Sequence, residues 1–318
     1  MKHPPYLRSS DAVTLLFLVI VTVIHLLFAD RIPHWSSAVV TNLLLGTAIV
    51  LSARSVHRRG AQSNLAVRLF RDWYLVPSIL IIYTQTSAAA FPLHGRDFDT
   101  VLIAADRWLF GTDPTHWAGQ FAHPVLTELL QLAYSSYYLF FIVLFYELYR
   151  REDHTWFRSG AMLVVYGFYL SYIGYMLVPA VGPRFTLHDF TMTDAELPGL
   201  FLTEYLRAFI NAGGGAPAGT ADPLLTVHRD AFPSGHTQLT LVAMYIAVAA
   251  RTRIRWWLVA GGTLLIISTI YLRYHYVIDV LAGMLFFLFT IWSGRRIDAW
   301  WNRKQITSAG EQINSDVS

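Results

Sequence analysis

Two histidines of this 318-residue sequence stand where nucleophilic or acid–base chemistry is possible. His275 and Asp279 lie four residues apart at the start of an apolar run, so on a helix they share one face. A carboxylate there can accept a hydrogen bond from one imidazole nitrogen, which leaves the other nitrogen free as a nucleophile or base. The pair is also compatible with a histidine that a helix-start carboxylate merely stabilises. A metal site is the third alternative, although no third ligand lies at convincing spacing.

The second histidine, His236, ends the run Pro233-Ser234-Gly235-His236 in front of another apolar stretch. Pro233 suits the first turn of a helix, and Ser234 can cap its free N–H groups. Gly235 lets the backbone approach a ligand closely. A helix start with free N–H groups binds anions, so His236 would stand beside an anion. Taken alone, these four residues also fit a plain turn.

Arginines accompany both histidines. Arg184 follows Pro183 where an apolar run ends, and Arg273 lies two residues before His275. A guanidinium can hold phosphate through two parallel hydrogen bonds, although each arginine alone also fits an anchor for lipid headgroups. Two histidines, an orienting carboxylate, arginines and a helix start are together the parts required for phosphoryl transfer through a histidine intermediate.

The composition places these residues in a membrane protein. Apolar residues make up 54% of the chain and charged residues 14%, whereas soluble proteins carry about 25% charged residues. So few charges cannot cover so much apolar surface, which excludes a soluble globule, and the lack of cysteine excludes a disulfide scaffold. The net charge of +3 is explained by topology signals, so no nucleic-acid partner is predicted.

A membrane-spanning helix needs about 17–25 mostly apolar residues. The sequence therefore predicts an all-α integral membrane protein with about eight spans. The predicted spans are residues 12–29, 36–53, 73–91, 126–147, 158–179, 234–250, 255–272 and 276–294.

The basic residues predict the orientation of these spans. Of the 24 lysines and arginines, 17 fall in the termini and in alternate connections and 7 in the other connections. By the positive-inside rule both termini are cytoplasmic, and the long connections 92–125 and 180–233 face outwards. All three chemical clusters then lie at the outer face, which for a bacterial inner membrane is the periplasmic side. We expect a short interfacial helix within Asp97–Gly111 and a flexible stretch over Gly213–Gly219.

Three regions follow from this map. Residues 1–72 form a two-span extension with its cytoplasmic loop, and residues 73–296 form the catalytic transmembrane core. Residues 297–318 form a polar cytoplasmic tail, which we expect to be disordered from Lys304 onwards.

Over roughly residues 97–290 the sequence resembles the type 2 phosphatidic acid phosphatase superfamily. The signature of that superfamily has three parts: Lys-x6-Arg-Pro, Pro-Ser-Gly-His and Ser-Arg-x5-His-x3-Asp. The second part matches completely at Pro233–His236. The third matches at Ser268, His275 and Asp279, but Thr269 stands at the arginine position.

The first part of the signature is degenerate, because Leu177 replaces its lysine and Phe185 follows Arg184 in place of proline. Gly-Pro-Arg at this place and Arg-Tyr-His-Tyr-Val-Ile-Asp in the third part are similar to inositol phosphorylceramide and sphingomyelin synthases. The segment Asp106–Gly111 is similar to bacterial members of the inositolphosphotransferase branch. This branch would imply a sphingolipid-like substrate.

The resemblance implies that six of the spans form a phosphatase-type core bundle, and it implies a mechanism without metal or cofactor. His275 would attack phosphorus to give a phosphohistidine, with Asp279 orienting its ring, while His236 would protonate the leaving alkoxide and then activate water or an acceptor hydroxyl. The implied phosphate-binding groups are Arg184, Arg273 and the N–H groups around Ser234 and Gly235. We infer that Arg273, one turn after Thr269, replaces the missing arginine if the seventh helix reaches that far.

The sequence thus predicts a membrane-embedded lipid phosphatase or phosphotransferase acting on membrane lipids from the outer face, with phosphoinositol as one possible transferred headgroup. A transporter or lipid scramblase without covalent chemistry is the alternative of another class. A non-catalytic member of the fold is a third reading, because the first motif is altered. Neither the lipid nor the oligomeric state follows from the sequence.

Overall fold

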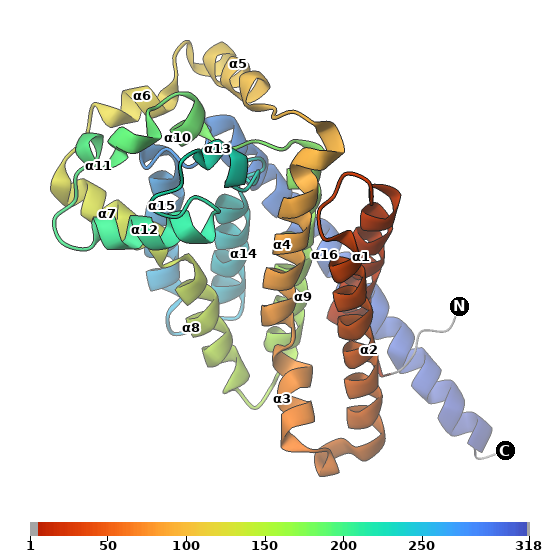
Figure 1. The fold of residues 1–318 in the computed structure, drawn as a ribbon. Helices are drawn as coiled ribbons and strands as arrows, with labels where there is room; N and C mark the ends of the chain where they lie inside the picture. The colour runs from red at the N-terminus through yellow and green to blue at the C-terminus, as the bar shows by residue number, and fades with distance from the viewer. Residues whose placement is uncertain (1–5, 317–318) are drawn as a thin grey trace.

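The computed structural model describes residues 6–316, and every regular element in that range is helical (Figure 1). Each predicted span coincides with one helix, or with a bent pair in the case of the fourth. In chain order these are α1 (Ser9–Leu27), α2 (Trp35–Arg59), α4 (Leu75–His94), α7 (Pro124–Ser135) with α8 (Tyr137–Tyr149), α9 (Thr155–Leu177), α14 (Gly235–Ala249), α15 (Arg255–Tyr271) and α16 (Val277–Asp316).

Five of these helices are long and apolar enough to cross a membrane, or six if the bent pair counts as one span. The chain is therefore an integral membrane protein, as its composition predicts. The count of eight spans stays a prediction, because α14 and α15 have only 15 and 17 residues.

The remaining helices are short and gather at the two ends of the bundle (Figure 1). At the end near the N-terminal part of α1 lie η1 (Gly60–Gln62) and α3 (Leu65–Trp73). At the opposite end lie α5 (Asp99–Phe110), α6 (Pro114–Gly119), α10 (Pro183–Thr186), η2 (Phe190–Met192), α11 (Thr193–Glu196), α12 (Thr203–Gly213) and α13 (Pro223–Thr226). The helix that the sequence predicts within Asp97–Gly111 is confirmed as α5.

Helix α14 lies among α8, α9, α15 and α16, and buried polar contacts fix its position. The Gln238 side chain, fully buried, donates to the carbonyl of Gly167 on α9 and to the Thr290 hydroxyl on α16, both at 3.0 Å. Its amide oxygen accepts the Ser171 hydroxyl at 2.6 Å. At Gly283 a Cβ atom would come within 2.6 Å of the Ser234 carbonyl, so only glycine lets α16 approach the start of α14 this closely.

The bend between α7 and α8 measures 49° and is centred on Ser136. The hydroxyls of Ser135 and Ser136 donate to the carbonyls of Gln131 and Ala133, a pattern that bends helices. Tyr134 precedes the bend and Tyr137 follows it, and both rings contact His236 in the first turn of α14.

The N-terminal hairpin of α1 and α2 packs on the core through α1, which contacts α4 and α9. Asp11 lies at the end of the hairpin that the predicted topology places on the cytoplasmic side. Its buried carboxylate accepts two hydrogen bonds from Arg71, at 2.6 and 2.5 Å, and one from the Tyr74 hydroxyl at 2.6 Å. The first two helices are therefore tied to α3 and α4 by a buried ion pair, in addition to apolar packing.

The sequence analysis expected the tail to be disordered from Lys304 onwards. This expectation is wrong for the backbone up to Asp316, because α16 continues without a break to that residue. The segment beyond Trp301 contains no proline and has several strong helix formers, so nothing in it stops the helix. Residues 317–318 of the tail lie outside the described residues.

Candidate active site

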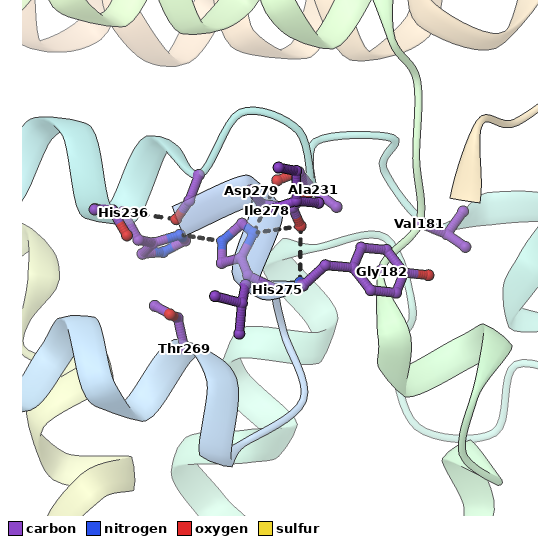
Figure 2. A network of polar contacts seen from close by, with 12 residues as sticks. Val181, Gly182, Ala231, His236, Thr269, His275, Ile278 and Asp279 are labelled. Carbon is purple, nitrogen blue, oxygen red and sulfur yellow. Dashed lines mark hydrogen bonds and ion pairs between the residues drawn. The ribbon is translucent and has the colours of Figure 1, made fainter. Parts of the chain in front are cut away.

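His275 and His236 meet at the end of the bundle that carries α5 and α10–α13 (Figure 2). His275 Nε2 lies 3.4 Å from His236 Nδ1. On the other side of its ring, His275 Nδ1 lies 2.8 Å from the Ala231 carbonyl oxygen and 3.5 Å from Asp279 Oδ2. The structure thus brings the three predicted catalytic side chains together, although α16 begins at Val277 and His275 precedes it.

These contacts fix the tautomer of His275. A backbone carbonyl can only accept, so Nδ1 of His275 must carry the proton that it donates to Ala231. In the neutral ring the lone pair therefore lies on Nε2, which is directed towards His236 Nδ1. His236 in turn lies against two aromatic rings, stacked on Tyr134 at 4.6 Å between centroids and tilted against Tyr137 at 4.5 Å. Both histidine rings are thus held before any substrate is bound.

The predicted cap at the start of α14 is confirmed, because the Ser234 hydroxyl accepts the N–H of Thr237 at 3.2 Å. The Ser234 N–H donates to the Asp279 carbonyl at 3.0 Å, which joins this helix start to α16. Pro233 lies before the cap and not in the first turn as expected, because α14 begins at Gly235. The N–H groups of Gly235 and His236, in the first turn, have no helical acceptors, and both residues line the cavity.

Two aspartates of α5 position the site, and sequence reasoning missed this role. Asp99 accepts the N–H groups of Val181 and Gly182, at 3.0 and 2.9 Å, and the Tyr276 hydroxyl at 2.8 Å. In this way one carboxylate joins the segment leading to Arg184 with the segment leading into α16.

Asp106 acts on the other side of the same junction. Its carboxylate accepts the N–H groups of Val277 and Ile278, at 2.9 and 2.8 Å, and so caps α16 two residues after His275. The sequence feature that could have indicated this role of Asp99 and Asp106 is their spacing: two acidic residues, seven apart, in an otherwise largely apolar interfacial helix.

Arg184, a predicted phosphate-binding residue, lies in the same cavity as the two histidines. Its side chain is 9% exposed. The guanidinium donates to Asn211 Oδ1 at 2.7 Å and lies over the rings of Phe185 and Tyr274, 4.6 and 4.7 Å from their centroids. One amide and two aromatic faces hold it without neutralising its charge, so the charge remains available to an anion.

Arg273 is not brought to this cavity. Helix α15 ends at Tyr271, and Arg273 adopts a left-handed backbone with φ of 65°, so it does not lie one helical turn from Thr269 as the sequence analysis inferred. Its buried guanidinium pairs with Glu196. Arg273 lines a separate pocket together with His188. Burial and the charge of Arg273 lower the pKa of His188 to about 4.

The cavity in front of the histidines has a volume of about 220 Å³ and a wall of tyrosines. Two residues of this wall, Tyr83 and Asp230, belong to a hydrogen-bonded chain. In it Tyr83 Oη lies 2.8 Å from His228 Nδ1 and donates to Asp230 Oδ2 at 2.5 Å. Gly213 and Gly214 close the wall, and the Gly214 carbonyl accepts the His228 N–H at 2.9 Å. The start of the glycine stretch expected to be flexible therefore has fixed contacts.

Among the side chains that the structure describes, no three from histidine, aspartate or glutamate gather as a metal ion would require. A family model described as PAP2 superfamily matches residues 100–293, more than half of the chain. The matched region runs from α5 into α16 and contains all the histidine, aspartate and arginine residues of the cavity. Neither a curated protein nor a solved structure matches the chain.

Proposed function

The chain belongs to the PAP2 superfamily, whose members are generally phosphatases, and on that premise we propose that it is a lipid phosphatase or phosphotransferase with a phosphohistidine intermediate. The proposal depends on one observation. His275 directs Nε2 towards His236 Nδ1 at 3.4 Å, inside a cavity that Arg184 also lines.

The first step would form the bond between His275 Nε2 and phosphorus. The lone pair of Nε2 attacks the phosphorus, and the bond from phosphorus to the leaving oxygen breaks as His236 passes its proton to that oxygen. Substrate would enter between the two rings, with the leaving oxygen on the His236 side. Asp279 and the Ala231 carbonyl keep the Nδ1 proton in place and stabilise the positive charge that the ring acquires.

The second step would reverse these roles. The oxygen of water or of an acceptor hydroxyl attacks phosphorus, its proton passes to His236, and the P–N bond breaks to return the lone pair to His275 Nε2. Arg184 and the N–H groups of Gly235 and His236 would bind the phosphate oxygens in both steps, where fixed donors contribute most of the rate enhancement. Hydrolysis and transfer differ only in which hydroxyl enters, and the resemblance to the inositolphosphotransferase branch favours transfer.

An apolar groove next to the cavity supports a lipid substrate. It has a volume of about 140 Å³ and shares Ile79, Leu80, Tyr138 and Phe168 with the catalytic cavity. From there it runs between α4, α8 and α9 towards Trp73. A phosphate bound at the histidines would leave its apolar chain beside this groove. The charge distribution supports an outward-facing, periplasmic site.

The proposed activity is tested with full-length protein purified in detergent and supplied with phosphatidic acid in excess EDTA. We expect inorganic phosphate to be released, because the histidine nucleophile, Arg184 and the helix N–H groups stabilise the transferring group without a metal. Loss of phosphate release in EDTA, with recovery on adding one divalent ion, would contradict this mechanism.

The groove predicts a dependence on chain length. Ala161 lines it on α9, so Ala161→Phe should fill part of the space for an apolar chain. We expect KM for a long-chain lipid phosphate to rise about tenfold, since a few buried CH₂ groups contribute ~0.8 kcal/mol each. KM for a short-chain analogue should change little. Steady-state kinetics with both substrates provide the check, and equal effects on both would exclude the groove as the chain site.

A further inference from the structure

Asp230 is a charged group of the cavity to which the transfer chemistry assigns no task. It lies next to Ala231, whose carbonyl orients His275, and its side chain lines the cavity together with both histidines. Only one of its oxygens, Oδ2, has a hydrogen-bond partner among the residues that the structure describes, namely the Tyr83 hydroxyl. The other oxygen, Oδ1, is not among the fully buried polar atoms, and it belongs to a side chain that lines the cavity.

The donor and acceptor order of this chain is determined. The Tyr83 hydroxyl has one proton and gives it to Asp230, so His228 Nδ1 must be the donor to the tyrosine oxygen. Burial pushes the pKa of Asp230 up, but His228, the Tyr83 hydrogen bond and the two active-site histidines together hold it below its ordinary value. Asp230 is therefore an ionised acceptor with a fixed orientation.

An ionised carboxylate is unfavourable in a pocket that binds only phosphate, because like charges repel in a site with restricted access to water. It is favourable beside hydroxyl groups, which can donate to it. Seven tyrosines line the same cavity and offer hydroxyls and ring faces with no further charge: Tyr83, Tyr134, Tyr137, Tyr138, Tyr172, Tyr175 and Tyr274. A volume of about 220 Å³ also leaves room for a group beyond the phosphate.

We propose that Asp230, held by Tyr83, is a hydroxyl-binding residue that selects a neutral polyol as the group exchanged at the phosphorus. This inference rests on the proposed function and specifies the acceptor or headgroup of the same site. Asp230 accepts a hydrogen bond from a hydroxyl that does not react, while the reacting hydroxyl gives its proton to His236. The carboxylate thereby places a polyol, and not water alone, next to the phosphohistidine.

The test measures how the phosphoenzyme divides its phosphoryl group between acceptors. Full-length protein in detergent receives phosphatidic acid with glycerol and 1-propanol at equal concentrations, so that the two probes differ only in their number of hydroxyls. We expect wild-type protein to form glycerol phosphate at least about tenfold faster than propyl phosphate. Asp230→Asn should reduce this preference about tenfold or more, as expected for loss of a hydrogen bond to a charged group, and should raise the share of inorganic phosphate.

Two further variants complete the design. Tyr83→Phe removes the hydroxyl that orients Asp230 and should lower the preference for glycerol by a smaller factor. Glu204→Gln removes the same charge from an exposed position of α12 and should keep the wild-type preference. Because the preference is a ratio of two products of one sample, it does not depend on the fraction of folded protein.

The outcomes separate the two proposals. Wild-type protein that releases phosphate without preferring glycerol would overturn the role of Asp230 and leave the proposed function standing. An unchanged preference in Asp230→Asn or in Tyr83→Phe, whether or not the total rate falls, would also overturn it. Absence of phosphate release from wild-type protein would instead contradict the proposed function itself.

Discussion

Replacing His275 by alanine is expected to lower turnover of a lipid phosphate by about 10⁴-fold or more. The Ala231 carbonyl and Asp279 hold Nδ1 of His275, so that Nε2 of the same ring is directed towards His236 in the cavity. In the proposed mechanism no other group of the cavity forms the covalent intermediate, because the His236 ring, held against Tyr134 and Tyr137, would serve as acid and base. The measurement is kcat with phosphatidic acid, normalised to folded protein.

A matched control is His116→Ala. His116 is an exposed histidine of α6 at the same end of the molecule, and its ring contacts the Leu187 carbonyl outside the catalytic cavity. We expect kcat of this variant to stay within about twofold of the wild-type value, since exposed substitutions rarely cost more than ~0.5 kcal/mol. A His275→Ala protein that keeps more than a few per cent of the wild-type rate would show that the nucleophile is another group.

The second large effect is expected at Arg184. Arg184→Ala should lower kcat by about 10²–10³-fold, the cost of losing one fixed donor to a developing negative charge. Arg184→Lys should recover only part of this loss, because a point charge cannot reproduce the planar pair of donors or the packing over Phe185 and Tyr274. Steady-state kinetics of both variants provide the check.

Arg273→Lys is the matched comparison for Arg184→Lys. It keeps a positive charge beside Glu196, outside the cavity, so kcat should stay close to that of the wild type. The opposite order, a severe loss in Arg273→Lys and a mild one in Arg184→Lys, would mean that Arg273 moves into the cavity when substrate binds and is the phosphate clamp that its place in the sequence first indicated.

The histidine pair could be predicted from the sequence because its signals are local. His275 and Asp279 are four residues apart, and His236 follows a helix-capping serine, so each cluster is visible in a few consecutive residues. Alternating apolar spans then place the clusters at the same end of their helices. The helices α14, α15 and α16 begin or end within a residue or two of the predicted limits at that end, which is why the clusters meet.

The groups that orient these side chains could not be predicted in the same way. The partner of His275 at 2.8 Å is the backbone carbonyl of Ala231, and a carbonyl has no residue type to recognise. Asp99 and Asp106 act on segments that follow them by 82 and 171 residues, a relation that only the tertiary structure determines. The proposed role of Asp230 could not be predicted from the sequence either, since it depends on a hydrogen bond from the Tyr83 hydroxyl of a distant helix.

Arg273 shows how a correct local pattern can mislead. Its distance of four residues from Thr269 would place both on one helical face, but the helix ends at Tyr271. The carbonyl of Thr269 then accepts the N–H groups of Tyr274 and His275, at 2.9 and 3.0 Å, as the chain turns away. After this turn His275 lines the cavity with His236, whereas Arg273 lines the separate pocket.

The most direct measurement of the central claim is the trapping of the phosphoenzyme. Protein mixed with lipid phosphate labelled in its phosphoryl group is quenched in alkali, in which phosphohistidine survives, and the labelled peptide is identified by mass spectrometry. We predict a label on His275 that acid removes, that is absent from His275→Ala, and that accumulates in His236→Ala supplied with a good leaving group. Rapid phosphate release without any covalent label, or a label on His236, would contradict the account.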